Sequence, residues 1–188
     1  GAFWALGPVS AAGSGLDNNQ VAVFMSVAVF AGALVQWPIG RLSDRIDRRI
    51  VLLTLLIGAA ITGVALWLFA ATGTLMLVFG FAFGALALPG YSLAAAHAYD
   101  KTSASNMVAT AATVLLANGV GSVIGPLIAT AFITPERPRG LFLFTALVEA
   151  VLAAYVLYRT RVQAALTETD KTSFDLATTA PVGGVVIS

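Results

Sequence analysis

The sequence carries little charge, because only 10% of its 188 residues are Asp, Glu, Lys or Arg, whereas soluble domains carry about 25%. Hydrophobic residues make up 59% of the chain. So small a charged inventory cannot cover the outside of a domain of this size in water. The composition therefore argues against a water-soluble globular protein and predicts that lipid surrounds most of the chain.

Cysteine is absent, and histidine occurs once. Without cysteine the chain has no disulfide framework, no thiolate metal site and no thiol nucleophile, and a single histidine argues against a His-based metal site. We therefore expect neither a metal nor a cofactor. The net charge of +1 gives no basic excess of the kind that indicates nucleic-acid binding.

Long uncharged runs are what the sequence has instead. They occupy residues 18–40, 50–99 and 102–135, and a fourth run, 141–158, contains a single carboxylate. A helix needs roughly 20 apolar residues to cross the hydrocarbon of a bilayer, and the run 50–99 holds two such helices because turn residues at 71–74 allow the chain to reverse. The sequence predicts six segments, at about residues 1–14, 19–39, 50–70, 75–98, 108–132 and 141–158.

The first segment is too short to span a bilayer, and it begins without Met and without a positively charged region before it. That is not the pattern of a signal peptide. We expect residues 1–158 to form an all-α bundle of six transmembrane helices with a truncated first helix, in a chain that is a fragment of a longer protein. Residues 159–188 are rich in Thr, show no helical period and are expected to form a disordered tail.

The positive charges predict how the bundle lies in the membrane. Only Arg137 and Arg139 fall on one side, and the loops after the second and fourth segments and the tail hold the other eight: Arg41, Arg45, Arg48, Arg49, Lys101, Arg159, Arg161 and Lys171. Cytoplasmic loops carry the excess of Lys and Arg. We therefore expect a multi-pass protein of the cell membrane with a cytoplasmic tail.

Small residues recur four positions apart in three of the segments. The pairs are Ala28 with Gly32, Gly80 with Gly84, and Gly121 with Gly125. At this spacing they lie on one face of a helix, where a neighbouring helix can approach closely. We expect these pairs to serve packing.

Two prolines stand where they would break a membrane helix. Pro89-Gly90 in the fourth segment lacks one N–H donor and frees one backbone carbonyl, which protein or water must then satisfy. Gly125-Pro126 repeats the device in the fifth segment, four residues after Gly121. Interrupted helices recur where transporters bind substrate or bend, and a purely structural kink is an equal alternative.

Two titratable residues lie within or beside the predicted spans. Glu149 is near the middle of the last segment, where a charged carboxylate is costly, so we expect it to be protonated or hydrogen-bonded. It is either a structural partner or a site for a proton that couples transport to a gradient. His97 lies three residues before Asp100, where a water-exposed pair with Asp100 is the simpler explanation than a proton site.

Residues 40–49, Gly-Arg-Leu-Ser-Asp-Arg-Ile-Asp-Arg-Arg, are the most informative stretch. We expect a short cytoplasmic loop in which Asp44 bonds a helix N-terminus or a nearby arginine, although a positive anchor alone would explain the charges. The pattern G-x-x-x-D-R-x-x-R-R between two hydrophobic segments resembles the loop motif of the major facilitator superfamily. Asp47 stands where that family usually has glycine, and the matching residues are Gly40, Asp44, Arg45, Arg48 and Arg49.

Residues 36–44 and 121–126 also resemble the C-terminal half of the bacterial YcaD-like group of this superfamily, and the likeness covers about residues 1–160. In that family two six-helix halves face each other around a central cavity. The resemblance implies that this chain is the second half and that its partner is the missing N-terminal half. It further implies secondary active transport of a small molecule, with proton coupling as an option, by alternating access across a bacterial inner membrane.

The same resemblance implies roles for individual residues. Asp44 and the neighbouring arginines would latch one half against the other on the cytoplasmic side. In the family the cavity is lined by the first, second, fourth and fifth helices of each half. The candidates for substrate contacts in this chain are therefore Trp4, Gln36, Tyr91, Ser92 and Asn118.

Two other functional classes stay open at this point. A channel or structural membrane subunit would also have six helices, although the sequence has no ring of charges that would form a filter. An intramembrane serine protease would need a nucleophile such as Ser14, in Gly13-Ser14-Gly15, within reach of His97. These residues are expected at opposite faces of the membrane, so we do not expect an enzyme.

Overall fold

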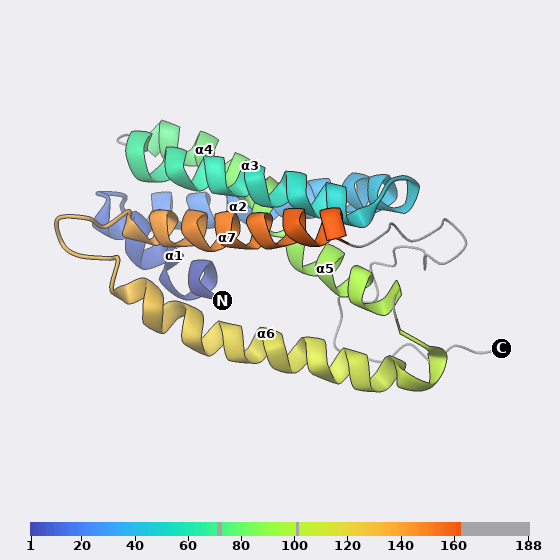
Figure 1. Ribbon diagram of the computed structural model, residues 1–188. Coiled ribbons are helices and arrows are strands. Elements are labelled where there is room, and N and C mark those ends of the chain that lie inside the picture. Colours follow the sequence, from blue (N-terminus) through green and yellow to red (C-terminus); the bar gives the residue numbers. More distant parts are fainter. Residues whose placement is uncertain (71–72, 101, 163–188) are drawn as a thin grey trace.

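The structure, a computed structural model, describes residues 1–70, 73–100 and 102–162. Within these ranges the chain forms helices and no β-strand, as the composition predicts. The elements are α1 (Ala2–Gly13), α2 (Asn18–Arg45), α3 (Arg48–Phe69), α4 (Gly73–Ala87), α5 (Pro89–Asp100), the 3-10 turn η1 (Ala104–Asn106), α6 (Met107–Thr130) and α7 (Gly140–Val162) (Figure 1).

Five of the described spans are long and apolar enough to cross a membrane: α2, α3, α4 together with α5, α6, and α7. The remaining helix, α1, has 12 residues and is shorter than the roughly 20 that a crossing requires. The helices follow the six predicted segments, and the chain has the all-α fold of a multi-pass membrane protein. Two residues of the predicted turn at 71–74, residues 71 and 72, lie outside the described residues.

The helices alternate in direction, so their ends gather at two ends of the bundle (Figure 1). One end contains Arg41, Arg45, Arg48 and Arg49 at the junction of α2 and α3, and we call it the arginine-rich end. The last turn of α7 reaches the same end with Arg159 and Arg161. The links from α1 to α2 and from α6 to α7 lie at the opposite end.

The link from α1 to α2 is short, and its residues provide hydrogen bonds to the backbone N–H groups at the start of α2. Gly15 has a φ of +94°, a left-handed conformation that residues with a side chain rarely adopt. Asp17 then caps α2: its carboxylate accepts from the Gln20 backbone N–H at 2.9 Å, and the Gln20 side chain accepts from the Asp17 N–H at 3.0 Å. This capping box satisfies two N–H groups that a helix start leaves unpaired.

The centre of the core is a cluster of phenylalanine rings toward the opposite end. Four helices contribute one buried ring each: Phe3 from α1, Phe24 from α2, Phe83 from α4 and Phe142 from α7. Neighbouring ring centroids lie 5.4 to 6.3 Å apart, mostly edge to face, the arrangement that aromatic rings prefer. The cluster therefore ties α1, α2, α4 and α7 into one packed unit.

Helices α2 and α4 approach each other very closely because one side of the contact is made of small residues. A methyl group added at Gly80 would lie 2.5 Å from the Phe24 ring, and one added at Gly84 would overlap the Ala28 backbone. On α2, a methyl group at Gly32 would lie 2.7 Å from the Leu88 side chain. Gly84 therefore lies against Ala28 and Gly80 against the Phe24 ring, and a larger residue at either glycine would force its neighbour to shift.

The stretch 40–49 is not the loop that the sequence predicts. Helix α2 continues to Arg45 and α3 begins at Arg48, so two residues, Ile46 and Asp47, separate the helices. Two residues are enough for this reversal because Asp47 caps α3: its carboxylate accepts from the Arg49 backbone N–H at 2.9 Å. The charged residues of the motif therefore occupy helix ends.

The two predicted helix breaks differ in the structure. The fourth predicted segment is divided at Leu88 into α4 and α5, with Pro89 as the first residue of α5. In contrast, α6 is continuous through Gly121, Gly125 and Pro126, so the expectation of an interrupted helix there is corrected. One proline removes one backbone hydrogen bond, which a long helix tolerates when the surrounding turns keep theirs.

The last helix is longer than predicted, because α7 continues past residue 158 to Val162. Residues 159–162 are thus helical and do not belong to a disordered tail. The predicted tail from residue 163 to residue 188 lies outside the described residues.

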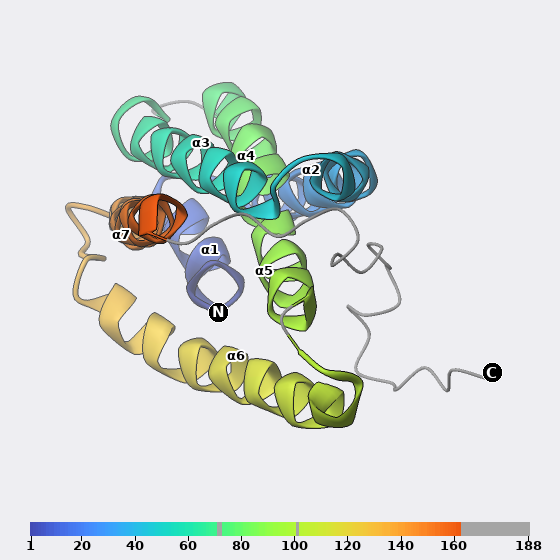
Figure 2. The ribbon, with the colours of Figure 1, turned by 45° about the vertical axis from the view of Figure 1, so that its right-hand side comes forward.

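Helix α6 lies along one edge of the bundle. Figures 1 and 2 agree that α2, α3 and α4 form the far side, that α1, α5 and α7 lie between, and that α6 lies beyond them. Ala129 is the one buried residue of α6 within the described chain. The most exposed apolar surface of the bundle therefore belongs to this helix.

Candidate functional site

The five predicted cavity residues come from four helices and differ in exposure. Trp4 on α1 is 53% exposed, and Tyr91 on α5 and Asn118 on α6 are also exposed. Gln36 on α2 is half-buried, and Ser92 on α5 is buried. Among the described residues, the structure joins two of the five by a hydrogen bond: the Gln36 amide Nε2 donates to the Ser92 hydroxyl Oγ at 3.0 Å.

A constant spacing along the chain explains why Gln36 meets Ser92. Gln36 follows Gly32 by one helical turn on α2, and Ser92 follows Leu88 by four residues across the division between α4 and α5. Four contacts between α2 and the divided span each join residues 56 positions apart: Phe24 with Gly80, Ala28 with Gly84, Gly32 with Leu88, and Gln36 with Ser92. We call this row of four contacts the seam.

Arg48 is the centre of a charge cluster at the arginine-rich end. Its Nη2 lies 2.9 Å from Asp44 Oδ1, and its Nε lies 3.3 Å from Asp100 Oδ2. The Arg48 side chain is 2% exposed and that of Asp100 is 1% exposed. The cluster therefore joins the start of α3 to the end of α5 through two buried charges and to the end of α2 through the partly exposed Asp44.

Sequence reasoning missed Asp100 as a partner of Arg48. The expected water-exposed pair of His97 with Asp100 is corrected in one respect, because the Asp100 carboxylate is buried against Arg48. A signal was present in the sequence: Asp44 and Asp100 are again 56 positions apart, so they continue the register of the seam and meet on either side of Arg48.

Asp47 and Arg49 form a second ion pair beside the cluster, with Arg49 Nη2 3.1 Å from Asp47 Oδ2. Burial alone would raise the pKa of Asp47. The hydrogen bonds from the Arg49 side chain and backbone, the charge of Arg49 and that of His97 outweigh burial and hold this pKa below its ordinary value. Asp47 thus fixes the reversal between α2 and α3 as an ionised cap.

The remaining residues of the motif differ in their surroundings. Gly40 is buried, whereas Arg45 is exposed. The Arg41 guanidinium carbon lies 4.0 Å above the centre of the Trp37 ring, a distance at which a cation is attracted to an aromatic face. The arginine-rich end thus has exposed cations at its surface and the Arg48 cluster beneath them.

Glu149 and His97 are placed differently from each other. Glu149 lies in the middle of α7, and its Oε2 atom is buried without a hydrogen-bond partner among the described residues. The hydrogen bond that a purely structural role would require is therefore not made by this oxygen. His97 is half-buried near the end of α5, close enough to Asp47 for their charges to interact.

The described residues contain no pair that would serve a serine protease and no metal site. Ser14 donates its hydroxyl to the Ser10 carbonyl at 2.7 Å at the opposite end, while His97 lies toward the arginine-rich end. Helix α2 connects these ends with 28 residues, a length of about 42 Å. The described residues also contain no group of three His, Cys, Asp or Glu that could hold a metal ion.

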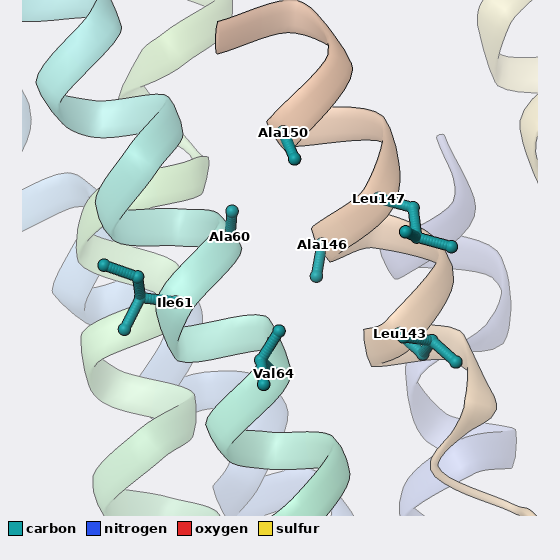
Figure 3. A pocket seen from close by; sticks show the side chains of 7 residues that line it. All are labelled: Ala60, Ile61, Val64, Leu143, Ala146, Leu147 and Ala150. Atoms are coloured by element: carbon teal, nitrogen blue, oxygen red, sulfur yellow. The ribbon is translucent and has the colours of Figure 1, made fainter. Parts of the chain in front are cut away.

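An apolar groove of about 310 Å³ lies between α3 and α7 (Figure 3). It is lined by Ala60, Ile61, Val64, Leu143, Ala146, Leu147 and Ala150. None of the predicted cavity residues lines it, and it presents no polar side chain to a solute. The groove is typical of a surface that contacts lipid rather than of a substrate site.

Comparison with known proteins matches residues 1–184 to the Major Facilitator Superfamily. An uncharacterized MFS-type transporter YcaD from Escherichia fergusonii is 29% identical over 161 residues, which cover 86% of this chain and 41% of that protein. Proteins of the same name from Salmonella paratyphi B and Salmonella newport are 30% identical over 157 residues, covering 84% of this chain and 40% of each relative. No solved structure matches the chain.

The chain thus spans about two fifths of the length of the curated relatives that it matches. Its helical spans, its arginine-rich motif and the family match over nearly the whole sequence agree with one another. The chain belongs to the major facilitator superfamily.

Proposed function

We propose that this chain is the C-terminal six-helix half of a secondary active transporter that moves a small solute across a membrane by alternating access. The observation that carries the proposal is the match to the Major Facilitator Superfamily over residues 1–184. Membership in this family points to a transporter rather than to an enzyme. The other half of the transporter is the proposed partner, since the chain spans about two fifths of its relatives.

The exposed face of α6 supports the proposal that this chain packs against a second half. Helix α6 buries Ala129 and little else, and an open apolar groove runs along it. The groove is lined by Leu115, Leu116, Gly119, Val120, Val123 and Ile124. Glycine allows close helix approach in a membrane, where small residues line helix interfaces, so this face suits a helix of the other half.

The proposed substrate cavity lies on α1, α2, α5 and α6, where Trp4, Gln36, Tyr91, Ser92 and Asn118 provide polar and aromatic groups. The exposure of Trp4, Tyr91 and Asn118 supports their availability to a solute. None of the five is an acidic or basic residue. This half is therefore proposed to contact the solute through hydrogen bonds and aromatic faces.

The proposed setting is the inner membrane of a bacterium, with the arginine-rich end and the C-terminal tail in the cytoplasm. The excess of Lys and Arg at that end supports this orientation. Proton coupling is proposed at Glu149, with His97 as the second candidate. Glu149 Oε2 is buried and has no hydrogen-bond partner among the residues that the structure describes, which supports this choice because intramembrane carboxylates commonly mark proton paths.

Transport is tested with the whole transporter, in which this chain is joined to its other half, reconstituted into proteoliposomes. A thermal-shift screen of small solutes first identifies one that raises the Tm, and uptake of that solute is then measured with and without an imposed proton gradient. Saturable uptake that depends on the gradient is expected. Passive flux that does not saturate would indicate a channel, and cleavage of a peptide substrate would indicate a protease.

We further propose that Asp44 and the exposed arginines latch the two halves together at the arginine-rich end. Asp44 is partly exposed although it binds Arg48 at 2.9 Å, so part of this residue lies at the surface of the arginine-rich end. Asp44→Asn is expected to slow uptake about tenfold, the effect of losing roughly 1.4 kcal/mol, while the amount of protein inserted in the membrane stays the same. Asp17→Asn, at the opposite end, is the matched control, and normal uptake by Asp44→Asn would exclude the latch.

A further inference from the structure

The groove between α3 and α7 is formed by helices that already touch each other. A methyl group added at Gly63 of α3 would lie 3.0 Å from the Phe142 carbonyl oxygen and 3.1 Å from the Ala146 side chain of α7. Beside this contact, the short side chains of Ala60 and Ala150 line the space between the two helices (Figure 3). The groove is therefore preformed, because small residues line it without filling it.

The groove is open toward the surroundings of the bundle. Ile61, Val64 and Leu147 line it and are exposed. Helix α6, which is proposed to face the other half, contributes no residue to it. Lipid tails are as apolar as leucine, so an apolar groove on a face of a membrane protein fits an acyl chain.

The length of the groove matches one leaflet of a bilayer. Its α7 residues run from Leu143 to Ala150, and Arg139 lies four residues before Leu143. At 1.5 Å per residue, the stretch from Arg139 to Ala150 is about 16 Å long, half of a hydrocarbon layer of roughly 30 Å. The groove therefore reaches from the opposite end of the bundle to the middle of the membrane, the depth to which the chains of one leaflet extend.

Arg139 places a cation near the outer end of the groove. It directly precedes α7, and its carbonyl accepts from the Phe142 backbone N–H at 3.0 Å, so the first turn of the helix begins at this residue. Arg139, Leu143 and Leu147 follow one another at intervals of four, the spacing of residues that share one face of a helix. The cation thus continues the row of α7 residues that lines the groove.

The Arg139 side chain makes no hydrogen bond or ion pair with the residues that the structure describes, and its buried Nη1 is one of the unsatisfied atoms. The carboxylate nearest in sequence, Glu136, interacts with Thr134 and Arg137 instead. Arg139 is half-buried, so a ligand can reach part of it. A cation without a partner at the edge of a membrane is costly, and a phosphate suits a guanidinium because two parallel N–H groups can donate to two of its oxygens.

We propose that this groove binds one anionic phospholipid, with an acyl chain between α3 and α7 and the phosphate on Arg139. The apolar lining takes the chain, and the guanidinium takes the charge that the chain carries at its end. The proposal goes beyond the proposed function and uses no step of transport. In the proposed orientation the lipid belongs to the leaflet that faces away from the cytoplasm.

Lipid binding is measured by native mass spectrometry on the whole transporter, freed of lipid in detergent and without solute. The probes are phosphatidylglycerol, phosphatidylcholine and diacylglycerol with the same acyl chains, and inorganic phosphate. Each variant is compared with the unsubstituted transporter, so lipids bound elsewhere cancel. For the site that the variants define, phosphatidylglycerol is expected to bind more tightly than phosphatidylcholine or diacylglycerol.

Arg139→Gln removes the cation, and Ala150→Leu fills the inner end of the groove. The first is expected to weaken the binding of one phosphatidylglycerol about tenfold, or about 1.4 kcal/mol, as for the loss of one hydrogen bond between charged groups. The second is expected to weaken it by a similar factor, because the new side chain displaces part of the acyl chain. For diacylglycerol, which has no phosphate, Ala150→Leu alone is expected to weaken binding.

Two matched controls are expected to keep the unsubstituted affinity for phosphatidylglycerol. Arg137→Gln removes an exposed charge from the same link, and Val151→Leu enlarges an exposed residue of α7 at the same depth that does not line the groove. An equal loss of affinity in Arg137→Gln would overturn the proposal, because it would show general attraction of anions to this end. An equal loss in Val151→Leu would likewise exclude the groove as the binding site.

Unchanged binding of phosphatidylglycerol in either Arg139→Gln or Ala150→Leu would overturn the proposal. Binding of inorganic phosphate that Arg139→Gln alone abolishes, with lipid binding unaffected, would replace the lipid with a free anion. A dimer that Ala150→Leu dissociates would show that a second copy of the chain occupies the groove. Because no solute is present, a failed uptake assay leaves these results intact, and normal uptake with unchanged lipid binding refutes the lipid site alone.

Discussion

At the scale of single residues, Arg48 shows how the fold handles a charge where few charges are available. Its guanidinium is buried and forms ion pairs with carboxylates of two other helices, Asp44 of α2 and Asp100 of α5. Removing one partner from a buried ion pair leaves a charge that neither water nor protein compensates. The stability of the arginine-rich end therefore depends on this cluster far more than on the exposed arginines around it.

Asp100→Asn is expected to destabilise the protein by about 3 kcal/mol because Arg48 loses one of its carboxylate partners. In detergent, this corresponds to a Tm lower by roughly 10 °C. The matched control is Asp17→Asn, an exposed helix cap at which Asn serves nearly as well as Asp. Equal melting temperatures of the two variants would show that the Arg48–Asp100 pair does not stabilise the bundle.

Glu149→Gln is expected to weaken proton coupling, because an amide has nearly the shape of the carboxyl group but cannot bind and release a proton in the membrane. Uptake by the whole transporter is measured between pH 6 and pH 8, and its pH dependence is expected to flatten in the variant. Glu136→Gln, in the exposed link before α7, is the control and keeps the unsubstituted profile. An unchanged profile in Glu149→Gln would assign this residue to packing alone.

At the scale of elements, the contrast between α4 and α5 is the main feature of the fold. Both lie along α2 in the same register, yet α4 offers glycine at the contact points and α5 offers a hydroxyl and a carboxylate. Close packing in a membrane depends on small side chains, whereas a hydrogen bond depends on one donor and one acceptor. The contacts that the two halves make along this register are therefore of different kinds, although α5 also buries Leu93, Ala95 and Ala96.

Gly84→Ala is expected to lower the stability of the bundle by about 1–3 kcal/mol, the usual effect of overpacking a filled interface, because the new methyl group would overlap the Ala28 backbone. Gly73→Ala is the matched control, since a methyl group at Gly73 would meet nothing within 4 Å. The measurement is the Tm in detergent together with the monodisperse fraction on gel filtration. Equal values for the two variants would contradict the close α2–α4 contact.

The sequence predicts the helices well because uncharged runs and bilayer thickness leave few alternatives. It predicts helix ends less well where a helix extends into a charged stretch. Arg41 and Asp44 look like loop residues in the sequence, yet they lie in the last turns of α2. The pairing of Asp100 with Arg48 was missed because it joins distant positions. One period, 56 residues, connects that pair to the seam, but it becomes visible only once two contacts of the seam are known.

At the scale of the whole molecule, the layers of Figure 2 place the well-packed helices on one side and α6 on the other. The aromatic core joins α1, α2, α4 and α7, and α6 contributes almost nothing to it. A membrane helix with so little contact inside its own bundle gains its packing from a neighbour. The proposed second half supplies that neighbour.

The orientation of the whole bundle is tested with single cysteines and a maleimide that does not cross membranes. A label at Glu136→Cys is expected to form in intact cells, because this link faces the outside in the proposed orientation. A label at Ile46→Cys, between α2 and α3, is expected only after the cells are permeabilised. Labelling of Ile46→Cys in intact cells would reverse the proposed orientation.

The division at Leu88 also has a consequence for how such a chain can diverge in evolution. Positions 80 and 84 are restricted to the smallest residues because a neighbouring backbone or ring occupies the space that any larger side chain would need. Positions 36 and 92 obey a looser rule, since another pair of side chains of similar size that form one hydrogen bond would keep this contact. A lineage that acquires a new solute is therefore free to rewrite the second pair jointly while it keeps the first pair fixed.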